Sequence, residues 1–165
     1  MNLTIRQIKL EDAKGFWSAL ASVAKEKRYI LTTEPPPFES TQAFVQENVE
    51  QSYAQYVALD GEKVIGWADI LPIDHPTMKH VGGLGMGVVA EYRGRGIGRK
   101  LLESAMQHAW ESGLKRLELE VFADNRAAIH LYEKHGYVQE GVKRYARLID
   151  GEYQDIVVMA QYRID

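Results

Sequence analysis

The spacing of apolar and polar residues alternates along the chain between the period of a strand and the period of a helix. Residues 3–8 alternate in the way expected for a strand with one buried face. From Phe16 to Val23 the apolar residues recur at helical spacing, and Glu11-Asp12 precedes them where a first helical turn favours negative charge. The N-terminal part therefore predicts a strand followed by a helix.

The next segment predicts an irregular loop and a second helix. Residues 29–38 are rich in aromatic side chains and contain Pro35-Pro36-Pro37, which is typical of a loop. Ser40 and Thr41 are candidate caps for a helix over residues 42–52.

The middle of the chain predicts a hairpin and then a strand that is unusually poor in side chains. The apolar runs 55–59 and 63–71 flank Asp60-Gly61, a dipeptide that favours a tight hairpin turn. Residues 81–89 continue as a strand, and such a bare strand favours a bulge or a ligand against its backbone. Its glycines are Gly82, Gly83, Gly85 and Gly87.

The C-terminal elements are each bounded by residues with capping or turn chemistry. They are a helix over 98–112 ending at Gly113, a strand over 117–121, a helix between the Asp124-Asn125 cap and Gly136, and two extended segments, 137–149 and 152–162, joined at Asp150-Gly151. The predicted order is β-α-α-β-β-β-α-β-α-β-β, without an internal repeat or a linker.

The turn between the glycine-rich strand and its helix has the chemistry of a pyrophosphate site. Glycine lets main-chain N–H groups approach a ligand, and the helix adds its unpaired N–H groups and the positive end of its dipole. Four cations, Arg93, Arg95, Arg99 and Lys100, surround this one turn. The end of the loop, Gly98-Arg99-Lys100-Leu101, fits neither a Walker A motif nor a dinucleotide fingerprint. The alternative is an ordinary strand-to-helix turn with solvated basic residues.

Composition limits the remaining classes of protein. A length of 165 residues suits one domain over 1–165, and the absence of cysteine excludes disulfides, thiolate metal ligands and a cysteine nucleophile. The histidines show no metal-binding spacing, so no metal is expected. A formal net charge of −3 argues against a nucleic-acid partner. No signal pattern or bilayer-spanning run is present, so we expect a cytoplasmic protein without a membrane partner.

Three motifs in this order resemble those of the GNAT superfamily of acetyl-CoA-dependent N-acetyltransferases. They are Arg93-x-x-Gly96-x-Gly98, Asn125-x-x-Ala128-x-x-Leu131-Tyr132 and Gly136-Tyr137. The resemblance implies an α+β fold, an α/β/α sandwich built on a twisted, mixed, mainly antiparallel sheet of seven strands with about four helices. It also implies acetyl-CoA as co-substrate, with its pantetheine arm admitted between the fourth and fifth strands.

The resemblance also implies the residues that bind the co-substrate. Met86, Gly87 and Val88 would line the pantetheine arm, and Asn125 would bond it. The pyrophosphate would be held by the turn residues Arg93, Gly94, Arg95, Gly96, Ile97, Gly98 and Arg99. Tyr132 would lie near the sulfur, where a phenol can give a proton to the departing thiolate. As alternatives, Tyr132 is a core aromatic and Asn125 only a helix cap.

The base that deprotonates the amine is less defined, because the fourth strand lacks the glutamate that many family members carry there. Glu120 on the fifth strand matches the position of the base in ribosomal-protein N-terminal acetyltransferases. A solvent-facing carboxylate in an alternating strand is the other interpretation of Glu120. His80, Asp69 and a water relay are further candidates.

The resemblance also implies where the acceptor site lies, because in relatives the segments that correspond to residues 25–38 and 145–153 frame it. Aromatic side chains there are candidate walls, and Glu34 or Asp69 is a candidate anchor for an ammonium group. Within the superfamily the pattern is similar to small-molecule acetyltransferases. The resemblance therefore implies acetyl transfer to a primary amine such as an amino acid, and we predict direct attack in a ternary complex. A protein N-terminus or lysine as acceptor, and a non-catalytic CoA sensor, remain alternatives. The two last strands are candidates for pairing in a homodimer.

Overall fold

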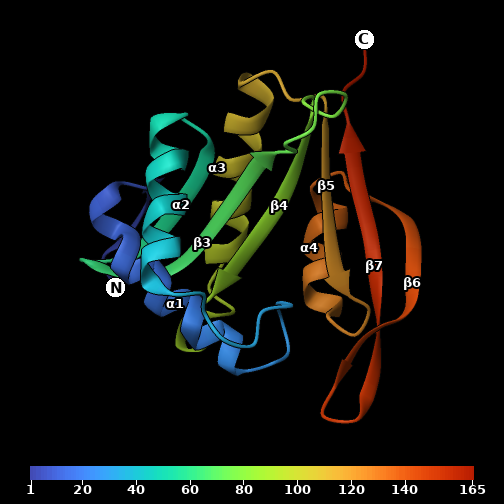
Figure 1. Cartoon of the computed structure of the whole chain (residues 1–165), viewed down its shortest axis with the longest axis horizontal. Helices are drawn as coiled ribbons and strands as arrows, with labels where there is room; N and C mark the ends of the chain where they lie inside the picture. Colours follow the sequence, from blue (N-terminus) through green and yellow to red (C-terminus); the bar gives the residue numbers. More distant parts are fainter. The chain divides into compact units, whose positions relative to one another are not determined.

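Seven strands and four α-helices follow one another in the predicted order (Figure 1) in the computed structural model, which describes residues 1–165. The elements are β1 (Leu3–Gln7), α1 (Ala13–Lys25), α2 (Phe38–Glu50), β2 (Ala54–Asp60), β3 (Lys63–Pro72), β4 (Val81–Val88), α3 (Ile97–Glu111), β5 (Arg116–Phe122), α4 (Arg126–Lys134), β6 (Val138–Ile149) and β7 (Glu152–Tyr162). Two short 3-10 helices, η1 (Leu10–Asp12) and η2 (Ala90–Tyr92), complete the list.

The strands form one sheet in the order β1-β2-β3-β4-β5-β7-β6. Antiparallel ladders join β1 to β2, β2 to β3, β5 to β7 and β7 to β6. The parallel ladder between β4 and β5 is short and pairs Val81–Gly83 with Arg116–Glu118. The predicted α+β class, with a mixed, mainly antiparallel sheet of seven strands and four helices, is confirmed.

Contacts divide the chain into two compact units. The first comprises Met1–Leu71 and Gly85–Gly113, and the second comprises Pro72–Leu84 and Leu114–Asp165. Strand β4 begins in the second unit and ends in the first.

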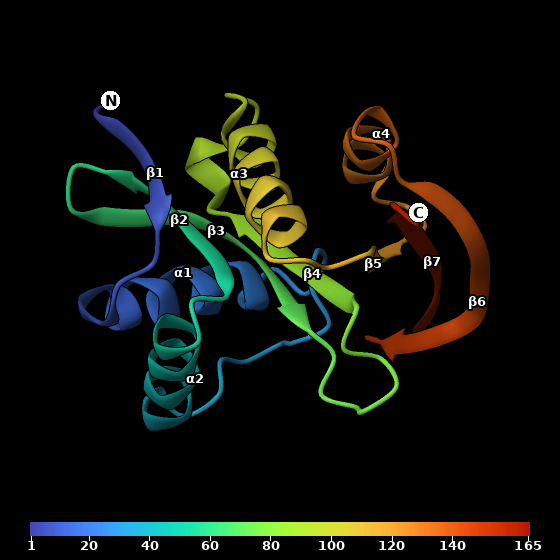
Figure 2. The ribbon, with the colours of Figure 1, turned by 90° about the horizontal axis from the view of Figure 1, so that it is seen from above.

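In the first unit, helices cover both faces of the sheet formed by β1, β2 and β3. Helices α1 and α2 lie on one face and α3 on the other (Figure 2). The core beneath α1 and α2 joins Phe16 of α1, Val45 of α2 and Trp67 of β3, and the rings of Phe16 and Trp67 meet edge to face at 5.6 Å. Burial of these large apolar side chains stabilises this face of the sheet.

In the second unit, α4 lies beside β5, and the long hairpin of β7 and β6 continues the sheet from β5 (Figures 1 and 2). Asp150 and Gly151 connect the hairpin strands with φ of 49° and 80°, as their predicted turn requires. Tyr145 also has a positive φ, 53°, at an irregularity in the ladder where its N–H donates to Asp155 Oδ1 at 2.9 Å.

The sequence predicts most helix ends well, with one exception. Asn125 caps α4, and Gly113 and Gly136 follow α3 and α4 with φ of 98° and 92°. The prediction that Ser40 or Thr41 caps a helix starting at residue 42 is wrong, because α2 begins at Phe38 with Pro37 as its N-cap. Proline fixes φ and needs no hydrogen-bond acceptor, so the chain enters the helix directly from the proline run.

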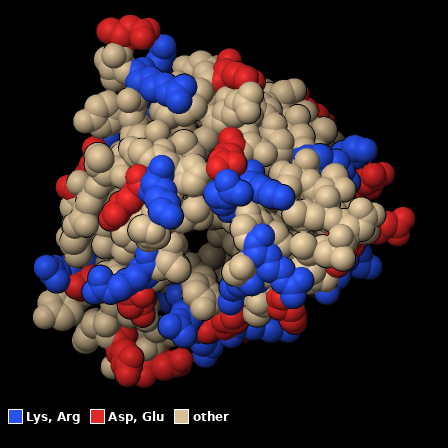
Figure 3. All heavy atoms as spheres, turned by 180° about the vertical axis from the view of Figure 1, so that it is seen from behind, with Lys and Arg blue, Asp and Glu red and all other residues tan.

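Charged side chains of both signs are interspersed over the face drawn in Figure 3, in keeping with the small net charge of −3. None of the helices is long and apolar enough to cross a lipid bilayer.

Candidate functional site

The turn from β4 into α3 contains two glycines in the left-handed region. Gly94 has a φ of 75° and Gly96 a φ of 76°. A Cβ atom at either position would meet no atom within 4 Å. The backbone conformation, and not a lack of space, therefore requires glycine here. When left-handed residues alternate with residues of negative φ, successive N–H groups point toward the same side. This is the geometry of an anion-binding nest.

Helix α3 begins directly at this turn, with Gly96 as its N-cap. The N–H of Lys100 donates to the carbonyl oxygen of Gly96 at 3.2 Å. The N–H groups between these two residues precede the first complete helical turn and have no helical acceptor. The side chain of Ile97 is only 1% exposed, so it fixes the start of the helix to the core. A firmly held helix N-terminus of this kind stabilises a phosphate group.

The four predicted cations fall into two groups: Arg95, Arg99 and Lys100 are exposed, whereas Arg93 is half-buried. Arg95 and Arg99 are exposed beside the turn, where Arg95 donates to the Glu91 carbonyl at 3.1 Å and Arg99 faces Glu103 at 3.6 Å. Neither side chain has a buried partner, so both can turn to a phosphate. Two guanidinium groups can balance the two negative charges of a pyrophosphate.

Arg93, by contrast, is held within the protein. Its Nε donates to the carbonyl oxygen of Val88 at 2.9 Å, and its two terminal nitrogens contact the Glu26 carboxylate at 2.8 and 2.5 Å. Its guanidinium also lies over the ring of Tyr29, 4.2 Å from the centroid. Arg93 thus connects the turn to β4 and to the C-terminal end of α1. Its predicted contact with pyrophosphate stays a prediction.

Side chains of β3 lie over the glycines of β4 in the first unit. The indole of Trp67 occupies the place of a side chain at Gly87, and Asp69 Oδ1 lies 3.3 Å from the position of a Cβ atom at Gly85. One face of β4 therefore has no side chains of its own, and side chains of β3 cover it. The glycines have this packing role in addition to the predicted one, in which the backbone of Met86, Gly87 and Val88 is accessible to the pantetheine arm.

Asp69 has the most perturbed carboxyl group of the first unit. Its side chain is partly buried, and removal from water raises the pKa of its carboxyl from 3.8 to about 7. No ion pair offsets this desolvation. A group with such a pKa exists in both protonation states near neutral pH, which suits the transfer of protons.

In the second unit, α4 carries two of the predicted residues. Asn125 accepts a hydrogen bond from the N–H of Ala128 at 3.2 Å, as a helix cap does. Tyr132 is 8% exposed and packs edge to face against Tyr137, with ring centroids 5.8 Å apart. Burial raises the pKa of the Tyr132 phenol to about 12, so the hydroxyl keeps its proton at neutral pH.

Glu120, also in the second unit, has an exposed side chain on β5 and pairs with Lys143 of β6. Its neighbour on the same face, Glu118, accepts a hydrogen bond from Arg116 Nε at 3.0 Å. Both carboxylates therefore have cationic partners, and the role of Glu120 as a base stays a prediction.

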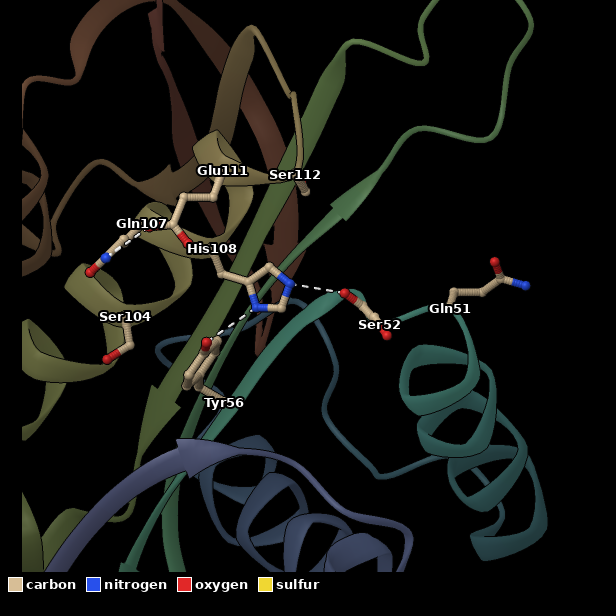
Figure 4. Close-up of a pocket in the computed structure, with 8 residues that line it drawn as sticks. All are labelled: Gln51, Ser52, Tyr56, Ser104, Gln107, His108, Glu111 and Ser112. Carbon is tan, nitrogen blue, oxygen red and sulfur yellow. Dashed lines mark hydrogen bonds between the residues drawn. The ribbon is translucent and has the colours of Figure 1, made fainter.

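A separate pocket of about 580 Å³ lies in the first unit, between α3 and the connection from α2 to β2 (Figure 4). His108 crosses it, accepting from or donating to Tyr56 at 3.1 Å through Nδ1 and reaching the carbonyl oxygen of Ser52 at 2.9 Å through Nε2. A carbonyl oxygen only accepts hydrogen bonds, so Nε2 carries a proton in this arrangement. In the neutral form of the ring, Nδ1 then accepts a hydrogen bond from the Tyr56 hydroxyl. None of the predicted site residues lines this pocket.

Comparison with known proteins identifies the family to which the chain belongs. A model of the Acetyltransferase (GNAT) family matches residues 17–137, which include the strand β4, the glycine turn and helix α4. The chain belongs to this family, and the resemblance of its three motifs is confirmed.

Two curated relatives illustrate the range within the family. L-amino acid N-acetyltransferase AaaT of Escherichia coli (strain K12) is 33% identical over 107 residues, or 64% of this chain and 65% of that protein. The chain thus spans slightly less than two thirds of AaaT. A putative [ribosomal protein bS18]-alanine N-acetyltransferase of Bacillus subtilis (strain 168) is 29% identical over 94% of this chain and 92% of its own length.

Solved structures agree on the fold. An acetyltransferase of the GNAT family from Streptococcus pneumoniae superposes with a TM-score of 0.89 at 29% identity, covering 98% of this chain and 99% of its own. The acetyltransferase yncA from Salmonella typhimurium, solved with its cofactor acetyl-CoA, has a TM-score of 0.91 at 18% identity, covering 98% and 94%.

Proposed function

We propose that the protein transfers an acetyl group from acetyl-CoA to the primary amine of a small molecule such as an amino acid. The observation that carries the proposal is the pair of left-handed glycines, Gly94 and Gly96, at the N-terminus of α3, flanked by exposed Arg95 and Arg99. This arrangement suits the pyrophosphate of CoA. Similarity to AaaT favours an amino acid as acceptor.

In the proposed mechanism the amine attacks the thioester directly, within a complex of enzyme, acetyl-CoA and acceptor. The nest and the arginines hold the pyrophosphate, while the backbone of Met86, Gly87 and Val88 holds the pantetheine arm. Asn125 bonds the same arm with the amide nitrogen that its capping role leaves over. Positioning the two reactants supplies much of the rate enhancement, because it removes the entropy cost of their encounter.

The carbonyl oxygen of the thioester gains negative charge in the transition state. A main-chain N–H group at the end of β4 would stabilise this charge. The N–H of Val89 donates to the Ile65 carbonyl at 2.9 Å and is already used. We therefore assign this role to the N–H of Val88. Tyr132, protonated at neutral pH, donates to the departing thiolate and regains a proton from the nitrogen of the collapsing intermediate.

A protein N-terminus is the second candidate acceptor, supported by the match to the putative bS18-alanine N-acetyltransferase over nearly the full length of both chains. In that case Glu120 is the candidate base. A third candidate, a CoA sensor without catalysis, is supported by the lack of a carboxylate on β4.

Release of free thiol from acetyl-CoA tests these proposals across amino acids, polyamines, aminoglycosides and peptides with N-terminal alanine. The protein adds no background, because it has no cysteine. We expect turnover with one class of small amine. Turnover with the peptides alone would favour the protein acceptor, and tight CoA binding by calorimetry without turnover would favour the sensor. Incubation with acetyl-CoA alone, followed by mass spectrometry of the intact protein, should reveal no acetylated enzyme.

A further inference from the structure

The proposed reaction needs a base, and strand β4 does not supply one. An amine with a pKa between about 8 and about 10.4 is mostly protonated at neutral pH and cannot attack until it loses a proton. The sequence of β4, VGGLGMGV, contains no carboxylate. Glu120 on β5 is exposed and pairs with Lys143. A carboxylate must come from elsewhere if the enzyme uses a side chain for this step.

Asp69 reaches β4 from the neighbouring strand. Its Oδ1 lies 3.3 Å, and its Oδ2 4.0 Å, from the position that a Cβ atom of Gly85 would take. Since residue 85 is glycine, the carboxyl group of Asp69 occupies the space of the side chain that β4 lacks. The next residue along β4 is Met86, the first of the three residues predicted to hold the pantetheine arm.

The face of the sheet that carries Asp69 also carries the predicted acceptor loop. Trp67, two residues earlier on β3 and hence on the same face, belongs to the core under α1 and α2. Tyr29 and Phe38, from the loop expected to frame the acceptor, pack against that core. An amine bound under this loop would therefore approach β4 on the Asp69 side.

The residues that lie beside Asp69 on the two neighbouring strands are uncharged. Gln55 of β2 pairs with it in the antiparallel register and shares its face, and Gly85 covers it from β4. The buried side chain of Gln55 accepts from Asn48 Nδ2 of α2 at 2.8 Å, and its own Nε2 has no hydrogen-bond partner. No cation from β2, β4 or α2 neutralises the carboxyl group, and desolvation alone raises its pKa. A substrate ammonium group would be its first ionic partner.

We propose that Asp69 is the general base of the reaction, and this inference rests on the proposed acetyl transfer. The Asp69 carboxylate takes one proton from the acceptor ammonium group, and the freed nitrogen lone pair forms a bond to the thioester carbonyl carbon. The C–S bond then breaks with its electron pair on sulfur. The second proton of the nitrogen passes to the thiolate, and protonated Asp69 returns its proton to solvent.

The test is the pH dependence of kcat/KM for the best acceptor, measured for the wild type and for Asp69→Asn, Asp69→Glu and Glu120→Gln. Asparagine keeps the size of a neutral aspartic acid, so Asp69→Asn should retain the fold and its affinity for acetyl-CoA. We expect it to lower kcat/KM about 100-fold at neutral pH. The rate that remains should follow only the ionisation of the amine. Asp69→Glu should restore part of the activity. In its pH profile of kcat/KM, the limb that reports the carboxyl group should lie at a different pH from that of the wild type.

Asp74→Asn is the matched control, because Asp74 is an exposed aspartate just beyond β3 and the substitution makes the same chemical change. It should leave the profile unaltered. A second readout is direct: with 13C-labelled aspartate, a carboxyl resonance titrating near pH 7 should be present in the wild type and in Asp74→Asn, and absent in Asp69→Asn.

Three results would overturn the inference. In the first, Asp69→Asn has kcat/KM within twofold of the wild type while Glu120→Gln loses activity. In the second, Asp69→Asn raises only KM for the amine and keeps the wild-type limb, which makes Asp69 an anchor for the ammonium group. In the third, the wild type itself acetylates no amine at any pH, and this result alone would also remove the proposed function.

Discussion

The indole of Trp67 fills the space above Gly87: its Cη2 atom lies 2.5 Å from the position that a Cβ atom of residue 87 would take. Trp67 is 4% exposed and belongs to the core between β3 and the helices α1 and α2. The end of β4, where the co-substrate is expected to bind, is thus kept in place by a core side chain of the adjacent strand.

Gly87→Ala should therefore destabilise the protein by about 1–3 kcal/mol, because the indole must move to admit a methyl group. Thermal unfolding and the emission spectrum of tryptophan would report the two effects. Gly83→Ala is the matched control on the same strand, since its Cβ would meet only Ile73 Cδ1 at an ordinary contact of 3.8 Å. Equal losses for both variants would contradict this role of Trp67.

Gly96→Ala should raise KM for acetyl-CoA, because alanine resists the φ of 76° that shapes the nest. The strain costs roughly 1–2 kcal/mol of stability. Gly61→Ala provides the control: Gly61 has a φ of 61°, a Cβ there would also meet no atom within 4 Å, and it lies in the hairpin between β2 and β3. We expect similar melting temperatures for the two variants and an altered KM only for Gly96→Ala.

The ion pair between Arg93 and Glu26 should contribute about 0.5–1 kcal/mol, measured as the coupling in a cycle of Arg93→Gln and Glu26→Gln. The hydrogen bonds from Arg93 lower the pKa of Glu26 from 4.5. A lowered carboxyl pKa gives stability that is present above the unfolded value and is lost as the pH falls through the folded value. The coupling should hence be full at neutral pH and fade below about pH 4.5. A coupling that persists in acid would contradict an ionic origin.

Tyr132→Phe should lower kcat about 100-fold with little change in KM for acetyl-CoA, because it removes the proton donor and keeps the ring. With the pKa of Tyr132 at about 12, the wild type loses no activity through this group between pH 6 and 9. Tyr137→Phe is the matched control, since Tyr137 is the buried aromatic partner of Tyr132. An equal loss in both variants would indicate a packing effect.

Asp69→Asn should be more stable than the wild type at high pH. Burial raises the pKa of Asp69 from 3.8 to about 7, so the folded state holds a proton that the unfolded state releases between these values. Stability is fully present below pH 3.8 and is lost as the pH rises through about 7. The gain on substitution should approach at most about 4 kcal/mol at pH 8 and vanish near pH 4. Denaturant unfolding at both pH values measures it, and a constant difference would contradict the shift.

Local sequence predicts the elements of this protein well because local physics controls them. The hairpin after Asp60, which turns at Gly61 and Glu62, one residue later than predicted, depends on residues within a few positions of each other, as do the cap at Asn125 and the stop at Gly136. The start of α2 is different. Two good capping residues, Ser40 and Thr41, lie inside the helix, because the proline run positions the chain to begin the helix earlier.

Side-chain roles at the site depend less on local sequence. Four cations near one turn predict a phosphate site, yet Arg93 turns back to Val88 and Glu26, a partner 67 residues away. The register between β3 and β4 cannot be derived from the sequence alone. The sequence therefore does not show that Asp69 lies beside Gly85.

The sequence by itself determined the order of the elements, the glycine turn before α3 and membership of the acetyltransferase family, since periodicity, capping and motif spacing are all properties of short segments. Only the tertiary structure decided which charged groups have partners and which are desolvated. Glu120 pairs with Lys143, whereas Asp69 lies over Gly85, and the residues beside it on the two neighbouring strands are uncharged. The pKa of a carboxyl group follows from its burial and its neighbours in space, and the register between strands sets both.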